Sequence, residues 1–109
     1  NIILENNNIQ NNVEIGNNNI LWSGNHIGHD TKISNNNFVS TNVIISGSVR
    51  IGDNNFFGVS TTFRDNIKIG NKCMFGAGSI ILKNIKDGSV TSPKSTEIRN
   101  IKSDKLKKI

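Results

Sequence analysis

Large apolar side chains recur at every sixth position along most of the chain. The series runs without a slip in register until Asp87 stands at the next place in it. Its members are Ile3, Ile9, Ile15, Leu21, Ile27, Ile33, Val39, Ile45, Ile51, Phe57, Phe63, Ile69, Phe75 and Ile81. An α-helix needs apolar spacings of three and four, and a single strand needs a spacing of two. The period therefore indicates a repeated unit of six residues.

The positions beside each apolar residue are also restricted. The next residue is often Gly or Ser, as at Gly16, Gly28, Ser34, Ser40, Ser46, Gly52, Gly58, Gly70 and Gly76. Four places after the apolar residue stand small or β-branched side chains, as at Val13, Thr31, Val43, Val49, Thr61, Ile67, Cys73 and Ser79. We interpret each unit as a short strand with the apolar side chain inward, followed by a corner whose Gly or Ser tolerates unusual backbone angles. Asparagine runs such as 17–19 and 35–37 fit such corners, although a biased composition would produce them too.

Three units of six residues make one triangular coil, so the repeat predicts an all-β parallel β-helix. We expect this domain to span residues 1–87, with a C-terminal loop and basic capping tail over 88–109. Within that tail, Ser95 and Thr96 are expected to begin a short helix that lies over the last coil. Its apolar side chains would be Ile98, Ile101, Leu106 and Ile109. Because the repeat is already in register at the first residues and the chain begins with Asn, we expect the natural protein to continue upstream.

Composition narrows the class of protein further. The single cysteine excludes an internal disulfide, and with only two histidines beside it we expect no metal site. Neither a membrane-spanning apolar run nor a leader peptide is recognisable, so we expect a cytoplasmic protein. The net charge of +5 is concentrated in residues 94–109, which hold six basic and two acidic side chains. Such a tail fits a solvated face, a membrane surface or ligand phosphates, but without interleaved aromatic residues we expect no nucleic-acid binding.

Both histidines fall in one stretch, and neither occupies an inward position. His29 lies two residues after Ile27, at or near a corner, and Gly47 follows one coil later in the same column. A glycine there leaves space and an accessible main-chain N–H beside the imidazole. An imidazole base next to an N–H donor suits acyl transfer, and Asp30 is placed to orient the ring. The alternative is an exposed His–Asp corner with no catalytic role.

Three other residues depart from the repeat. Trp22 stands where later coils have Ser or Gly, so its ring must project outward, to a subunit interface or a ligand groove. Arg64 also replaces a small corner residue and is a candidate phosphate contact or a plain surface charge. Cys73 falls in the small inward column, so we expect it to be structural.

These features together resemble the left-handed β-helix sugar acyltransferases. The resemblance lies in the hexad repeat, the stretch 23–30 (Ser-Gly-Asn-His-Ile-Gly-His-Asp), and the later segments 45–47, 69–70 and 75–78. Over roughly residues 10–95 the chain is similar to bacterial nucleotide-sugar N-acetyltransferases of the bacillosamine type and to sialic acid O-acetyltransferases. The left hand of the coil is an implication of this resemblance.

The resemblance implies a homotrimeric, acetyl-CoA-dependent enzyme with its active site between neighbouring prisms. His29 would be the general base, Asp30 its supporting carboxylate, and the Gly47 N–H the oxyanion donor. The pantetheine arm of acetyl-CoA would run along Val59 and Ala77, flanked by Gly76 and Gly78. The family's closing Gly-Asn-Pro-Ala-Lys is matched only by Thr-Ser-Pro-Lys-Ser at 91–95, and its N-terminal nucleotide-sugar-binding domain is not found in these residues.

The predicted activity is acetylation of an amino group on a nucleotide-linked sugar, for surface glycan synthesis. Acetylation of a sugar hydroxyl stays open, because one base and one oxyanion donor serve either nucleophile. A non-catalytic β-helix trimerisation module is the alternative from another class. A metal-dependent hydratase on the same fold is disfavoured, since it needs three histidines around zinc.

Overall fold

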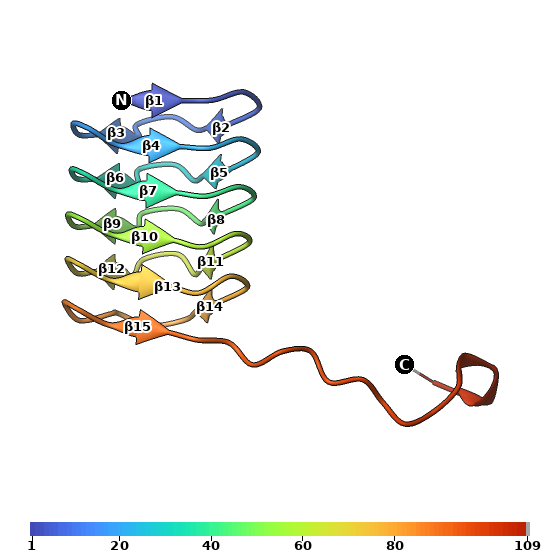
Figure 1. The fold of residues 1–109 in the computed structure, drawn as a ribbon. Coiled ribbons are helices and arrows are strands. Elements are labelled where there is room, and N and C mark those ends of the chain that lie inside the picture. Colours follow the sequence, from blue (N-terminus) through green and yellow to red (C-terminus); the bar gives the residue numbers. More distant parts are fainter. Residues whose placement is uncertain (109) are drawn as a thin grey trace.

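The computed structural model describes residues 1–108 and contains a triangular β-helix over most of that length (Figure 1). The chain winds through short strands of two residues each, separated by tight corners. The strands are β1 (Ile2–Ile3), β2 (Asn8–Ile9), β3 (Glu14–Ile15), β4 (Ile20–Leu21), β5 (His26–Ile27), β6 (Lys32–Ile33), β7 (Phe38–Val39), β8 (Ile44–Ile45), β9 (Arg50–Ile51), β10 (Phe56–Phe57), β11 (Thr62–Phe63), β12 (Lys68–Ile69), β13 (Met74–Phe75), β14 (Ile80–Ile81) and β15 (Val90–Thr91). The predicted all-β parallel β-helix is confirmed.

Three parallel sheets form the faces of the prism. Sheet A has the order β1-β4-β7-β10-β13-β15, sheet B has β14-β11-β8-β5-β2, and sheet C has β12-β9-β6-β3. Strand partners lie one coil apart in the sequence, as in Ile20 opposite Phe38 and Phe38 opposite Phe56. Figure 1 shows the chain passing along sheet A, then B, then C as it descends, which is a left-handed coil.

The second residue of each strand points inward and forms the core. Leu21, Val39, Phe57 and their equivalents in the other sheets are fully buried, as the six-residue series predicts. Three phenylalanines, Phe57, Phe63 and Phe75, fill the centre with ring centroids 5.0 to 5.3 Å apart. The two end coils depart from this burial: Ile3 of the first coil is 43% exposed, and Thr91 of β15 in the last coil is only partly buried.

The corners differ from the prediction in one respect. The left-handed backbone occurs three places after the inward residue, at Asn6 and every sixth residue to Gly78, and not at the Gly or Ser directly after it. The residue after the inward position is small because the next coil lies against it. A Cβ added at Gly28 would lie 2.6 Å from the Ser46 carbonyl carbon and 2.7 Å from the Gly47 nitrogen. Close approach of two backbones, not a positive φ, selects glycine here.

Asparagine has two structural roles in the prism. Many asparagines occupy the left-handed corner position, which this residue tolerates better than other non-glycine residues. Others form a buried ladder: the main-chain N–H of Asn37 donates to Asn19 Oδ1 at 2.9 Å, and that of Asn55 donates to Asn37 Oδ1 at 2.9 Å. Each ladder amide also donates to a main-chain carbonyl, as Asn37 does to Gly52 at 2.9 Å. The coil geometry therefore gives the asparagine runs a structural role, although Asp30, Ser48 and Lys72 take the same corner position on other coils.

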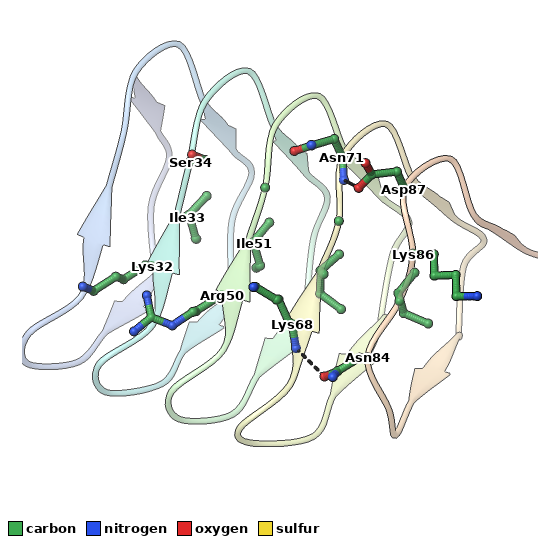
Figure 2. A pocket seen from close by; sticks show the side chains of 14 residues that line it. Lys32, Ile33, Ser34, Arg50, Ile51, Lys68, Asn71, Asn84, Lys86 and Asp87 are labelled. Atoms are coloured by element: carbon green, nitrogen blue, oxygen red, sulfur yellow. Dashed lines mark hydrogen bonds between the residues drawn. The ribbon is translucent and has the colours of Figure 1, made fainter.

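The last coil is two residues shorter than the others. Ile85 takes the place beside Ile69, and β15 pairs with β13 through Met74 opposite Val90. Side chains of the shortened segment cap the preceding coil: Asn84 Oδ1 accepts from the Lys68 N–H at 2.9 Å and Asp87 Oδ1 from the Asn71 N–H at 2.8 Å (Figure 2). Sheet A thus continues to residue 91, past the expected domain boundary at residue 87.

The C-terminal tail differs from its prediction. No helix begins at Ser95 or Thr96; within the described residues the tail has only the 3-10 turn η1 (Ser103–Lys105), and it runs away from the prism (Figure 1). Ile98 is 93% exposed, so the tail contributes no apolar face to the last coil. The spacing of Ile98, Ile101 and Leu106 therefore does not produce the predicted helix. Ile109, the fourth apolar residue of that prediction, lies outside the described residues. No helix in residues 1–108 is long and apolar enough to cross a membrane.

Candidate active site

The corner between sheets B and C carries His29 and Asp30, directly after β5. Hydrogen bonds to both neighbouring coils hold its backbone. The His29 N–H donates to Gln10 Oε1 at 2.9 Å on the preceding coil, and the His29 carbonyl accepts from the Ser48 N–H at 2.8 Å on the next. Asp30 takes the left-handed position of the corner, with a φ of 59°. The coil geometry therefore fixes the backbone from which both side chains project.

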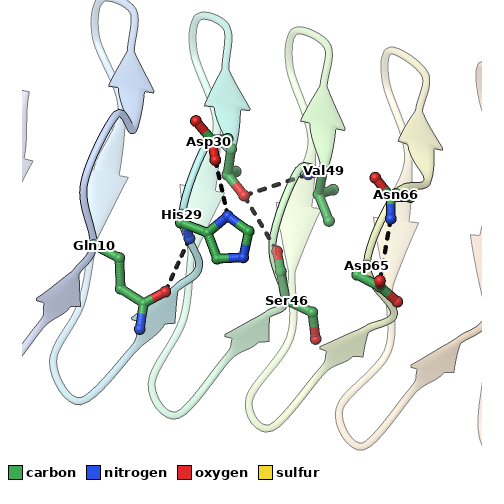
Figure 3. Close-up of polar contacts among 8 residues, drawn as sticks. Gln10, His29, Asp30, Ser46, Val49, Asp65 and Asn66 are labelled. Atoms are coloured by element: carbon green, nitrogen blue, oxygen red, sulfur yellow. Dashed lines mark hydrogen bonds and ion pairs between the residues drawn. The ribbon is translucent and has the colours of Figure 1, made fainter.

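The two side chains form a pair at the surface (Figure 3). His29 Nδ1 lies 2.9 Å from Asp30 Oδ2, and both side chains are about half exposed. This hydrogen bond from His29 is the main cause that holds the pKa of the Asp30 carboxyl below its usual value, and it outweighs the opposing effect of desolvation. An ionised carboxylate accepts the Nδ1 proton, which leaves the lone pair of the neutral ring on Nε2.

The imidazole lies over Gly47, one coil further on. A Cβ added at Gly47 would lie 2.5 Å from His29 Nε2 and 2.6 Å from His29 Cε1. The space left by the missing side chain is thus occupied by the ring itself. Among residues 1–108, no acceptor receives the main-chain N–H of Gly47. His29 Nε2 and a main-chain N–H without an acceptor therefore belong to the same corner of the prism, and a base and an N–H donor are groups that acyl transfer can use.

The second predicted group, Val59 with Gly76, Ala77 and Gly78, lies on the corner between sheets A and B. The main-chain N–H groups of Val59 and Ala77 have no acceptor within the described part of the chain. At the corner between sheets C and A, side-chain oxygens take the equivalent donors, as when the Asn35 N–H donates to Asp53 Oδ1 at 2.8 Å. The A–B corner therefore presents a column of unused donors that the C–A corner does not.

One chain does not bring these two groups together, because they occupy different edges of the prism. Sequence analysis also missed Gln10, whose side chain fixes the His29 backbone. Its signal is its place one coil and one residue before His29, which becomes visible only when the coil length is known. In residues 1–108, no three side chains of the metal-ligating types come together.

The three other residues that depart from the repeat lie on the sides of the coil that the repeat predicts for them. Trp22 is 45% exposed on the outside of the prism, with its ring edge toward Phe38 at 6.3 Å. Phe38 stacks in turn on Phe56 at 5.4 Å, so a line of aromatic rings runs over the outer face of sheet A. Cys73 is fully buried, as its inward place predicts, and Arg64 is exposed.

Residues 48–83 match the family model described as bacterial transferase hexapeptide (six repeats). Residues 48–83 therefore carry hexapeptide repeats of this type. The chain is similar in structure to PerB from Caulobacter crescentus, which was solved in complex with CoA and GDP-perosamine. The TM-score is 0.64 and the sequence identity 18%, and the match covers 81% of this chain and 51% of PerB. It is also similar to the acetyltransferase domain of PglB from Neisseria gonorrhoeae, with a TM-score of 0.53 and 20% identity over 81% and 52%.

These matches confirm the resemblance to the hexapeptide-repeat sugar acyltransferases in repeat and in fold. No curated protein is matched by sequence alone. The chain spans about half the length of the solved structures that it matches.

Proposed function

We propose that this chain is an acetyl-CoA-dependent acetyltransferase domain acting on an amino group of a nucleotide-linked sugar. The observation that supports this most directly is the His29–Asp30 pair lying over Gly47, whose main-chain N–H has no acceptor among residues 1–108. The similarity to PerB, whose structure holds CoA and GDP-perosamine, agrees in fold with this chemistry. Synthesis of surface glycans in the cytoplasm is the setting in which we place this activity.

In the proposed reaction, the acceptor nitrogen attacks the carbonyl carbon of the acetyl thioester. His29 Nε2 takes the proton that the nitrogen loses, while the Asp30 carboxylate accepts a hydrogen bond from Nδ1–H and stabilises the imidazolium that forms. The Gly47 N–H donates to the carbonyl oxygen as negative charge develops on it. The bond between carbon and sulfur then breaks, and the imidazolium returns its proton to the departing thiolate. A sugar hydroxyl could replace the amine in the same sequence of steps.

The donor column at the A–B corner fits the proposed binding of acetyl-CoA. Val59 and Ala77 offer N–H donors that no described residue uses, and Gly76 and Gly78 flank Ala77 without bulky side chains. The amide groups of a pantetheine arm need donors and acceptors of this kind along an extended path. Val59, Gly76, Ala77 and Gly78 are therefore the proposed contacts for the co-substrate.

A homotrimer is proposed because the base and this donor column lie on different edges of one prism. A neighbouring chain must supply the second edge if both are to meet one acetyl-CoA molecule. The outer face of sheet A offers apolar area for such a contact, since Phe56 is 40%, Met74 55% and Val90 68% exposed. The outer face of sheet C is charged instead, with Glu14, Lys32, Arg50 and Lys68 in its outward places.

The proposed function is tested by acetyl transfer from acetyl-CoA to amino-sugar nucleotides, with the wild type and His29→Ala compared. The expected result is a rate that falls toward acidic pH in the wild type, because a protonated imidazole has no lone pair, and a rate at least about a hundredfold lower in His29→Ala. Transfer that is unchanged in the variant contradicts the base role. Transfer only to hydroxyl acceptors favours O-acetylation, and a folded trimer without transfer or CoA binding favours the trimerisation module.

A further inference from the structure

The outer face of sheet C carries a line of positive charge that the proposed acetyl transfer does not use. Lys32, Arg50 and Lys68 are outward residues of β6, β9 and β12, and the strand register places each directly opposite the next. Neighbouring parallel strands are about 4.8 Å apart, so like charges stand at close range. Like charges directly opposite each other destabilise a sheet unless something neutralises them.

The chain itself neutralises only one end of this line. Lys32 Nζ forms an ion pair with Glu14 Oε2 at 3.1 Å. Within residues 1–108, neither Arg50 nor Lys68 forms an ion pair. Both side chains are exposed, so their charged groups are free to meet an anion from solution.

These cations form one wall of a groove of about 680 Å³. Its far end is made by Asn84, Lys86 and Asp87, where the last coil is shortened (Figure 2). Four basic side chains and one acidic side chain line the groove, and the carboxylate of Asp87 is already hydrogen-bonded to the Asn71 N–H at 2.8 Å. The groove is therefore suited to a ligand with more than one negative charge.

A second hollow shares two lining residues with this groove and reaches Asp30 of the proposed active site. Its volume is about 430 Å³, and its charged lining residues are Lys32 and Arg50 with Glu14 and Asp30. Lys32 and Arg50 thus border both hollows, and an anion held between them lies beside the corner that carries His29.

We infer that the groove on sheet C binds the diphosphate of a nucleotide ligand, with Arg50 and Lys68 as its main contacts. Arg50 offers a fork of N–H donors and Lys68 a point charge, both of which pair well with phosphate oxygens. Two sources share this chemistry: the nucleoside diphosphate of the acceptor and the diphosphate of CoA. Diphosphate binding itself does not depend on the proposed function. Only the assignment of the bound ligand to the transfer reaction rests on the proposed function.

The test is calorimetric titration of the chain with pyrophosphate, UDP, GDP and CoA, using the double variant R50Q/K68Q. The variant K94Q/K105Q removes the same charge from the exposed tail and serves as the matched control. We expect saturable binding of a nucleoside diphosphate that weakens with added salt, about tenfold or more weaker binding in R50Q/K68Q, and no change in the control. Melting temperatures should not fall in either variant, since all four residues are exposed and R50Q/K68Q removes like charges that stand opposite each other.

The arms of this titration separate the two sources. UDP or GDP binding that persists in the presence of saturating acetyl-CoA assigns the groove to the acceptor nucleotide. Mutual exclusion, with CoA binding weakened in R50Q/K68Q, assigns it to CoA. Absence of saturable binding of all four ligands, or equal weakening in both double variants, overturns the inference. Because acetyl transfer is measured separately, loss of the proposed function with intact UDP or GDP binding leaves the groove standing.

Discussion

Replacing Gly47 by alanine separates the chemistry of this corner from its stability. The added Cβ would lie 2.5 Å from His29 Nε2, so the imidazole must move from its place over Gly47. Gly47 is not among the residues with positive φ, and the obstructed group is a half-exposed side chain that is free to rotate away. The substitution should therefore displace the proposed base without disturbing the coil.

The expected magnitude follows from this displacement. A misplacement of about 1 Å in a reacting group costs on the order of a hundredfold in rate, so kcat for acetyl transfer should fall about a hundredfold. The melting temperature should stay close to that of the wild type. Gly28→Ala is the contrasting variant: its Cβ would lie 2.6 Å from a main-chain carbon that cannot rotate away, and overpacking of this kind costs about 1–3 kcal/mol.

The assay is steady-state acetyl transfer combined with thermal unfolding, on Gly47→Ala, His29→Ala and the double variant. If Gly47→Ala acts through the ring, it should slow the reaction little or not at all once His29 is already alanine. Full activity in Gly47→Ala would refute the reasoning. So would losses in the two single variants that multiply in the double variant, because the two residues would then act independently.

Three further substitutions test the corner and the core. Asp30→Asn should lower kcat about tenfold in the same assay, since the ring loses its ionised partner. The pKa of Asp30 lies below its usual value, so its hydrogen bond to His29 is present at neutral pH and is lost only as the pH falls through that lowered value. Phe63→Ala should lower the free energy of unfolding by about 3–5 kcal/mol in urea melts, since its fully buried ring packs against two other phenylalanines at 5.0 and 5.2 Å. Asn37→Leu should cost about 2–4 kcal/mol in the same measurement, because the buried Asn55 N–H and a main-chain carbonyl lose their partners. A cost below about 1 kcal/mol in either core variant would contradict the packing or the ladder described above.

The core of the fold is predictable from the sequence because each inward residue is set by a local, repeated pattern. The structural roles of glycine and asparagine were harder to predict from the sequence. Gly28 is required by a backbone one coil away, and Asn37 bonds to residues one coil before and after it, so neither requirement appears in a short window of sequence. The shortened last coil, with Ile85 in the inward place, is likewise visible only from the pairing of strands.

The candidate site was predictable to a similar extent. His29 and Asp30 were identified because they stand outside the inward series, and the structure joins them at 2.9 Å. Gln10 and the cationic line through Arg50 were not identified, since the register between coils was applied to the inward columns and to the column of His29 and not to the other outward positions. Contacts of this kind require knowing which residues 18 or 19 positions apart become neighbours.

The central claim is that this β-helix binds acetyl-CoA as a co-substrate, and calorimetric titration of the chain with acetyl-CoA, compared with free CoA, tests it most directly. The account predicts saturable binding of one acetyl-CoA per chain. Absence of binding at millimolar acetyl-CoA, in a chain that is folded and trimeric, would contradict it.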